Sequence, residues 1–153
     1  MSIYDVFSGG SKPFDKEQWA AQKQAQRKEA YELIDNTCSE MMSSGDSFRQ
    51  YLDVQGRFDR YSVNNAILVS AQMPEATQLK EKAAWKQSRV YVNKDAQKVV
   101  ILEPSKEYTR GDGSKAVGYN AKEVYDISET SAKDRQEAQE KKSMREIVSA
   151  LID

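Results

Sequence analysis

One predicted helix is apolar on nearly all of its sides, and this feature limits the possible folds more than any other. The helix follows Ser62, a residue type that often caps helix N-termini, and Pro74 ends it. Its small and apolar side chains are Val63, Ala66, Ile67, Val69, Ser70 and Ala71. A helix with this pattern is surrounded by other elements. We therefore expect residues 63–72 to lie at the centre of the molecule.

The two ends of the chain are too polar to contribute much to that core. The chain is 39% apolar and 31% charged, whereas globular proteins average about 45–50% and about 25%. The polar excess is concentrated in residues 12–28 and 128–145. A length of 153 residues fits one ordinary domain. We expect one domain whose core comes from the middle of the chain.

Two more helices are predicted before the central one. Asp15, followed three residues later by Gln18, is typical of a capping box, so the first helix should begin near Lys16. Gly45 is expected to end this helix, and Asp46 to cap the next one. The second helix has one mainly apolar face, formed by residues at spacings of three and four: Phe48, Tyr51, Leu52, Gln55 and Phe58.

The second half of the chain predicts strands. β-Branched and aliphatic residues at 90–92 and 99–102 flank the polar link Asn93 to Lys98, which indicates a hairpin. A brief helix or turn is expected before it, at residues 77–88.

A second hairpin is predicted between residues 107–110 and 117–120, because Asp112-Gly113 fits a tight turn. Residues 122–127 resemble one more strand. The last helix has one apolar face, formed by Met144, Ile147, Val148 and Leu151. The predicted fold class is α+β: N-terminal helices packed on a small antiparallel sheet of hairpins, with a C-terminal helix.

The chain contains no histidine, which excludes several kinds of catalytic site. Histidine is the commonest general base and a common zinc ligand, so neither a Ser-His-Asp triad nor an HExxH metal helix can form. Cys38 is the single cysteine and makes no zinc site alone. The acidic residues form no cluster on a shared face. We predict no catalytic residue, no metal site and no cofactor, and hence no enzymatic activity.

A single cysteine with no partner favours a reducing compartment. No run approaches the ~18 apolar residues of a membrane span, and the opening MSIYDVFSGG lacks a charged leader followed by an apolar run. These features predict a cytoplasmic protein without a membrane partner.

Basic, aromatic and amide side chains alternate between Arg57 and Pro104. Residues 57–98 hold eight basic and four acidic side chains, a net charge of +4, whereas the whole chain is at -1. A nucleic-acid strand is held by cations along its phosphates and by aromatic rings against its bases. We expect a groove between the central helix and the first hairpin to gather the candidate residues, which are Arg57, Arg60, Tyr61, Asn65, Gln72, Trp85, Tyr91, Lys94 and Lys98.

Each candidate also has a structural interpretation. The two arginines stand near the N-terminus of the central helix, which favours a phosphate, but they can equally pair with neighbouring aspartates. Trp85 can fill the core, and Tyr61 can pack as a helix staple. The amides of Asn64 and Asn65 can bond to nearby backbone groups.

Several of these residues belong to a pattern that resembles the N-terminal single-stranded-DNA-binding domain of ArdC-type antirestriction proteins. The similarity covers most of the chain and is closest to the branch from mobile elements of Gram-positive gut bacteria, including the opening FSGGSKPFDKEQW. The matching motifs are Arg57-Phe58-x-Arg60-Tyr61-Ser62-x-x-Asn65, Gln72-x-Pro74-x-Ala76-Thr77, Trp85, Ile101-Leu102-x-Pro104 and Val124-Tyr125-Asp126-Ile127-Ser128-x-Thr130.

The resemblance implies a module that binds single-stranded DNA with little sequence preference and protects incoming plasmid or conjugative DNA from restriction. Related proteins carry a metallopeptidase-like domain with an HExxH helix after this module, and this chain has no such helix. One departure is the link from Asn93 to Lys98, where relatives usually have a lysine-glycine turn; this puts the contact of Lys94 in question.

The expected organisation is an N-terminal tail (1–14), an ArdC-like domain (15–127), and a polar spacer and helix (128–153) that lead to a missing C-terminal domain. The alternative function is a protein-interaction module that binds a restriction or DNA-transfer protein without contacting DNA. Its support is the overall acidity, with a pI of about 5.7, and the exposed lysine-glutamate helices.

Overall fold

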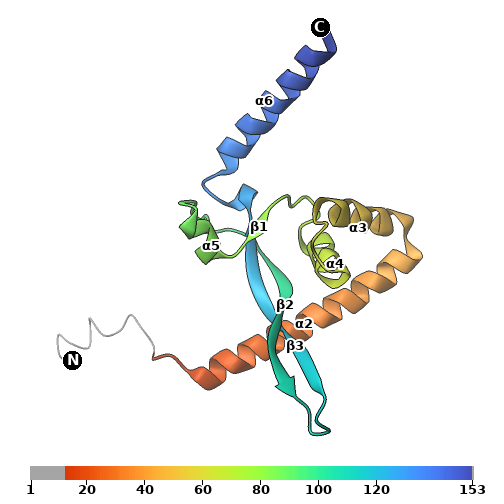
Figure 1. Ribbon diagram of the computed structural model, residues 1–153, viewed down its shortest axis with the longest axis vertical. Coiled ribbons are helices and arrows are strands. Elements are labelled where there is room, and N and C mark those ends of the chain that lie inside the picture. The colour runs from red at the N-terminus through yellow and green to blue at the C-terminus, as the bar shows by residue number, and fades with distance from the viewer. Residues whose placement is uncertain (1–12, 153) are drawn as a thin grey trace, which may run out of the picture.

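The computed structural model describes the backbone of residues 13–152 and the side chains of residues 13–133 and 142–152. Three helices come first, then strands and short helices, and a final helix (Figure 1). The elements are α2 (Lys16–Ser43), α3 (Gly45–Arg57), α4 (Val63–Gln72), β1 (Leu79–Lys80), α5 (Lys82–Gln87), β2 (Lys98–Thr109), β3 (Lys115–Asp126), the 3-10 turn η1 (Ile127–Glu129) and α6 (Lys133–Ile152). The predicted α+β class is confirmed.

Two of the predicted helix starts are confirmed. Asp15 accepts hydrogen bonds from the N–H groups of Glu17 and Gln18 at the start of α2. Ser62 accepts one from the N–H of Asn65 at the start of α4. Side-chain oxygens at these positions satisfy backbone donors that have no partner inside the helix, which explains why the signal is readable from sequence.

The predicted junction between α2 and α3 is wrong. Ser44, in an extended conformation (φ -133°, ψ 116°), ends α2 by donating its N–H to the carbonyl of Glu40. Its hydroxyl also accepts from the N–H of Ser47 and so caps α3. Because the joint is extended rather than left-handed, no glycine is needed to end α2. Gly45 is instead the first residue of α3, and Asp46 lies inside that helix rather than capping it.

The sheet has three antiparallel strands in the order β1-β3-β2. Strands β2 and β3, of twelve residues each, form one long hairpin. The hairpin predicted at residues 107–120 is its tip, and the strand predicted at residues 122–127 is the continuation of β3. Its turn holds Gly113 at φ +87°, and the carboxylate of Asp112 accepts from the N–H and hydroxyl of Ser114.

The predicted hairpin between residues 90–92 and 99–102 does not form. Val92 makes an isolated bridge with Thr130, and Val99 pairs with Val124. The apolar run of β2 could pair with residues 90–92 or with β3. It pairs with β3 because that strand forms a much longer ladder and has a matching apolar face.

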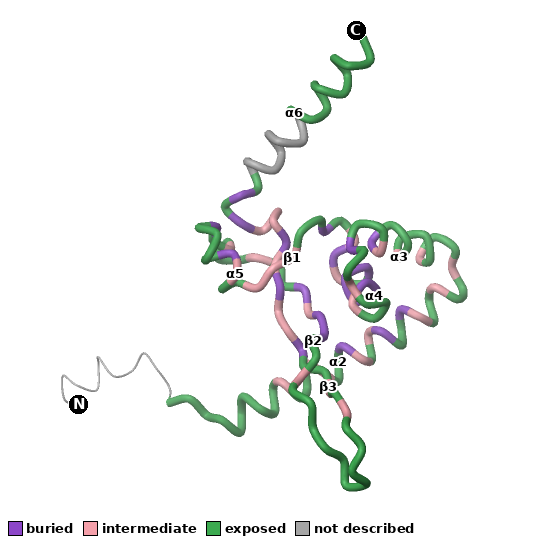
Figure 2. Tube along the Cα trace, in the orientation of Figure 1, coloured by how far each residue is buried: buried purple, intermediate pink, exposed green. Residues whose placement is uncertain are grey.

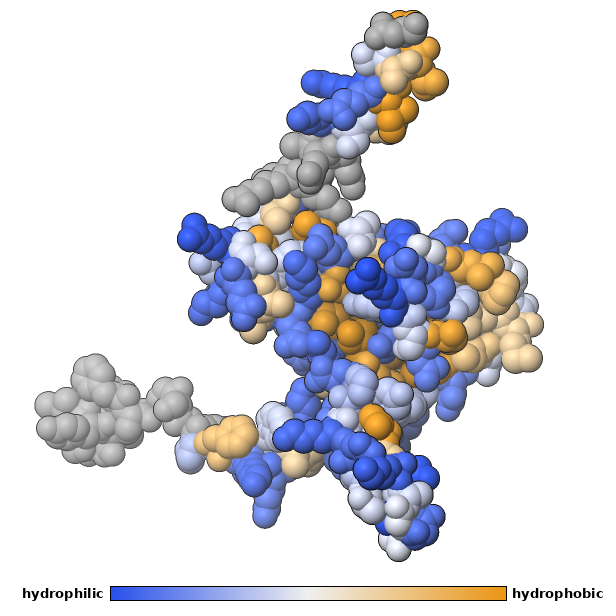
Figure 3. Space-filling model, in the orientation of Figure 1, coloured by the Kyte–Doolittle hydropathy of each residue, from blue (hydrophilic) through white to orange (hydrophobic). Residues whose placement is uncertain are grey.

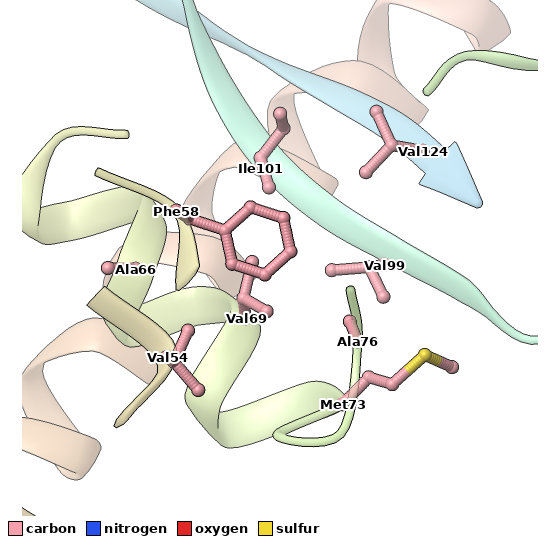
Figure 4. Packing of buried hydrophobic residues seen from close by; sticks show 9 residues of the cluster. All are labelled: Val54, Phe58, Ala66, Val69, Met73, Ala76, Val99, Ile101 and Val124. Atoms are coloured by element: carbon pink, nitrogen blue, oxygen red, sulfur yellow. The ribbon is translucent and has the colours of Figure 1, made fainter. Parts of the chain in front are cut away.

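The core confirms the central position of α4. One cluster joins α4 to α3 and to the hairpin (Figure 4), through Val54, Phe58, Ala66, Val69, Met73, Ala76, Val99, Ile101 and Val124. A second cluster joins α4 to α2 and β2, through Ala30, Ile34, Ile67, Leu68 and Leu102. Figure 2 shows the buried positions gathered at α4 and the adjacent strands, while the far end of the hairpin and the beginning of α2 are exposed.

On α3 the predicted apolar face is only partly correct. Phe48 and Leu52 are about half exposed, whereas Val54, which the prediction omitted, is fully buried. Phe58 is buried at the end of the helix, as predicted. The face that packs is therefore rotated from the expected one.

The chain beyond β3 begins with packed residues rather than with the predicted polar spacer. Thr130 and Ala132 are buried, and Ala132 packs with Trp85 and Val90. Helix α6 then projects away from the body (Figure 1), with Met144, Ile147, Val148, Leu151 and Ile152 exposed along it, as Figure 3 shows in orange near the C-terminus.

Most of the predicted tail, residues 1–14, lies outside the described residues. Among the helices described, none combines the length and the apolar character needed to cross a membrane.

Candidate nucleic-acid interface

The nine predicted site residues do not share one groove. Arg60, Tyr61 and Asn65 lie at the beginning of α4, near the hairpin position where Pro104 pairs with Tyr119. The others extend to the opposite end of the sheet, where Lys98 pairs with Tyr125. Six residues of strand separate the two positions, which corresponds to about 20 Å. The prediction of one groove that holds all nine residues is therefore wrong.

The amides of Asn65 and Gln72 are occupied within the fold. Asn65 donates to the carbonyl of Leu102 (2.8 Å) and accepts from its N–H (2.8 Å). Gln72 does the same with Val100 (2.8 and 2.9 Å) and also donates to the carbonyl of Leu68 (3.0 Å). Strand β2 is at the edge of the sheet, so these side chains replace the missing neighbouring strand. Neither amide is free to contact a base.

Trp85 is a core residue, so the prediction that its ring stacks on a base is wrong. Its side chain is 2% exposed, and the indole N–H donates to the carbonyl of Tyr125 (2.9 Å). The Nζ of Lys80 lies 4.9 Å from the centre of the indole ring. The alternative interpretation of Trp85 as a core plug is the one that fits.

Two predicted cations are engaged within the chain. The guanidinium of Arg57 donates to the carbonyl of Pro74, which follows the C-terminal end of α4, whereas Arg60 precedes the N-terminal end of that helix. Lys98 forms an ion pair with Glu123 (3.0 Å), and the hydrogen bond in this pair raises the pKa of the lysine.

Tyr91 and Lys94 are exposed, but on the loop that precedes β2. This loop is held against the start of α6: the N–H of Tyr91 donates to the hydroxyl of Ser131, and the N–H of Asn93 to the carbonyl of Glu129. These two residues belong to a surface separate from that of Arg60.

A concave site does exist at the beginning of α4. We call it the tyrosine cleft; it has a volume of about 340 Å³. It is lined by Tyr31 of α2, by Arg60 and Tyr61 of the link before α4, by Ser62, Asn64 and Asn65, by Leu102 and Pro104 of β2, and by Tyr119 of β3. Three aromatic rings and one guanidinium thus converge from three segments of the chain: α2, the link before α4, and β3.

The chemistry of the tyrosine cleft is that of a mixed polar and aromatic surface. Arg60 is exposed at the N-terminal end of α4, where the helix dipole and the backbone N–H groups of the first turn favour an anion. Tyr119 is 44% exposed, so its ring can be covered by a ligand. Burial raises the pKa of Tyr61, although Lys122 partly opposes this, and the phenol therefore stays protonated at neutral pH.

Sequence reasoning missed Tyr31 and Tyr119. Tyr31 shares a helix face with the buried Ala30 and Ile34, a pattern that indicates core rather than site. Tyr119 comes next to Pro104 only through the register of the long hairpin. No local signal in the sequence links the two tyrosines, because they meet through tertiary structure alone.

Among the residues whose side chains are described, no group of three or more cysteine or acidic residues is arranged to hold a metal ion. Comparison of the chain with models of known protein families, with curated proteins and with solved structures gave no match.

Proposed function

We propose that this chain is a single-stranded DNA-binding module of an antirestriction-type protein from a plasmid or conjugative element. The observation that carries the proposal is the tyrosine cleft, in which Tyr31, Tyr61 and Tyr119 line the same concave surface as Arg60. The resemblance of the sequence to ArdC-type proteins supports the biological role.

The chemistry of the cleft favours a single strand over a duplex. Bases in a single strand can leave their stack and lie against aromatic side chains, and each such contact is worth about 1–3 kcal/mol. Arg60, beside the first turn of α4, supplies a cation for a phosphate. Stacking is possible with every base, so the proposed binding has little sequence preference.

The test is a fluorescence anisotropy titration of a labelled oligonucleotide at several salt concentrations. Each phosphate neutralised adds about -0.7 to the log-log slope of affinity against salt for a single strand. Arg60→Ala should therefore make the slope shallower by about 0.7. Tyr119→Ala should weaken binding by about 5- to 150-fold without changing the slope.

Arg49→Ala is the matched control, because Arg49 is exposed on α3 and outside the tyrosine cleft. It removes the same charge and should leave the slope close to that of the parent. Absence of binding by the parent at low salt would refute the proposal. Equal slopes for the Arg60 and Arg49 variants would show that the tyrosine cleft is not the binding site.

A protein-interaction role without DNA is the second candidate, and the exposed apolar side of α6 favours it. Here α6 would bind a purified restriction enzyme or DNA-transfer protein, and nuclease treatment would not affect the complex. Val148→Asp, which puts a charge on the apolar side, should abolish that complex while leaving oligonucleotide binding unchanged.

A further inference from the structure

We infer that the bound strand continues from the tyrosine cleft into a second binding site along the first half of α2, an inference that rests on the proposed function. Four side chains with the required chemistry follow one another at intervals of four residues: Trp19, Lys23, Arg27 and Tyr31. Residues with this spacing lie on one side of a helix. This side of α2 therefore carries two cationic groups between two aromatic rings.

This side of α2 borders a hollow of about 440 Å³ between the helix and the hairpin, which we call the α2 hollow. Its lining consists of Trp19, Ala20, Lys23, Gln24 and Arg27 from α2, and of Glu103, Asn120 and Ala121 from the hairpin. It contains an indole, two cations and two side-chain amides. These are the groups that hold a nucleic-acid strand without reading a fixed sequence.

Trp19 is not explained by packing. It is 50% exposed, and the ring of Phe14, at a centroid distance of 6.3 Å from it, is 74% exposed. Trp85, the other tryptophan, shows the contrast: it is 2% exposed with its N–H bonded to the backbone. A large indole face left open beside two cations has the form of a stacking platform.

The two sites adjoin at one pair of side chains. The guanidinium carbon of Arg27 lies 5.8 Å from the ring centre of Tyr31, so these side chains form a shared wall. Arg27 lines the α2 hollow, and Tyr31 lines the tyrosine cleft. From Trp19 to Tyr31 the helix rises about 18 Å, which is the length of about five nucleotides in a strand that keeps the ~3.4 Å spacing of a duplex.

Two carboxylates near the α2 hollow, those of Glu103 and Glu123, contact lysines other than Lys23; the Lys122 that contacts Glu103 also pairs with Glu81. The carboxylate of Glu103 lies 3.4 Å from the Nζ of Lys122. Glu123 of β3 accepts a hydrogen bond from Gln26 (2.9 Å) and pairs with Lys98 (3.0 Å). Among the described residues, neither Lys23 nor Arg27 forms an ion pair with a carboxylate, so both are available to phosphates.

The experiment compares two double variants that remove the same charge. Lys23→Ala with Arg27→Ala empties the α2 hollow of cations, and Lys82→Ala with Lys86→Ala removes two exposed lysines from α5. With a 15-nucleotide oligothymidine, the first variant should make the salt slope shallower by about 1.4, because two phosphate contacts are lost. The α5 variant should keep the slope of the parent. Alanine favours helix at all four positions, so both variants should fold.

Oligonucleotide length supplies the second measurement. For the parent, affinity should keep rising until the strand spans both sites and then level off. For the variant without Lys23 and Arg27, affinity should level off about five nucleotides earlier. The strand should also quench the fluorescence of Trp19, and Trp19→Phe, which leaves only the buried Trp85, should remove that quenching while binding at the tyrosine cleft persists.

The outcomes separate the two proposals. If the parent binds and Arg60→Ala weakens it, but the α2 and α5 double variants behave alike in slope and length dependence, the α2 hollow is not part of the path. If the parent does not bind at all, the proposed function itself fails. A shallower slope and an earlier plateau in the α2 variant alone support the inference.

Discussion

The hydrogen bonds of Gln72 to the edge of the sheet predict a large loss of stability in Gln72→Leu. The variant keeps a side chain of similar size but loses the bonds to the carbonyl and N–H of Val100 and to the carbonyl of Leu68. Both groups of Val100 are then left without their partner. Each such group costs about 1–3 kcal/mol when buried, and Gln72 is half-buried, so the expected total is about 2–4 kcal/mol.

The assay is urea unfolding followed by circular dichroism. With a slope of about 2 kcal/mol per M, the midpoint should fall by about 1–2 M. Gln22→Leu is the matched control, because Gln22 is exposed on α2, and its free energy of unfolding should stay within about 0.5 kcal/mol of the parent. If Gln72→Leu and Gln22→Leu unfold at the same midpoint, the reasoning that the amide replaces a strand is refuted.

Asn65 extends the same prediction. Combining Asn65→Ala with Gln72→Leu removes both side chains that cover β2, which leaves its N–H and carbonyl groups open at the sheet edge. Open edges pair with other chains. Sedimentation velocity should therefore detect self-association in the double variant at concentrations where the parent is monodisperse, and an unchanged distribution would count against the idea.

Three more predictions follow from single contacts. Trp85→Phe should lower the free energy of unfolding by about 1–3 kcal/mol, measured by urea denaturation, because the backbone carbonyl of β3 loses its indole donor inside the core. Burial raises the pKa of Asp126, but hydrogen bonds from the hydroxyl and N–H of Ser128 and from the N–H groups of Thr77 and Gln78 outweigh it and hold the pKa below its usual range. This carboxylate stabilises the fold above the unfolded-state pKa, and its contribution should disappear as the pH falls through the lower folded-state pKa; unfolding of Asp126→Asn from pH 6 to pH 2 should lack that component. Tyr91→Ala with Lys94→Ala should leave the oligonucleotide affinity of the tyrosine cleft within about twofold in the anisotropy titration, since both lie on a separate loop.

The parts of the fold that depend on neighbouring residues could be predicted from the sequence. The caps Asp15 and Ser62 act within three residues of themselves, and the apolar pattern of α4 requires burial wherever the helix lies. The tight turn at Gly113 also follows from local chemistry.

The parts that depend on distant pairing could not. The run from Val99 to Leu102 fits either residues 90–92 or β3, and only the complete sheet decides between them. The prediction of the site was incomplete for the same reason, because it also depends on residues that are distant in sequence. A half-buried amide such as Asn65 looks identical in sequence whether it bonds to a strand edge or to a ligand. The meeting of Tyr31 with Tyr119 depends on where α2 crosses the hairpin.

The double role of Ser44 restricts where the chain can change length. With one residue ending α2 and starting α3, no spare segment exists between the two helices. An inserted residue on the helical side of the joint would rotate the rest of α3 by about 100° and carry Val54 out of the interior. Insertions and deletions should therefore be tolerated at the exposed turn around Gly113 but not at Ser44. The length of the joint between α2 and α3 thus fixes which side of α3 faces the interior.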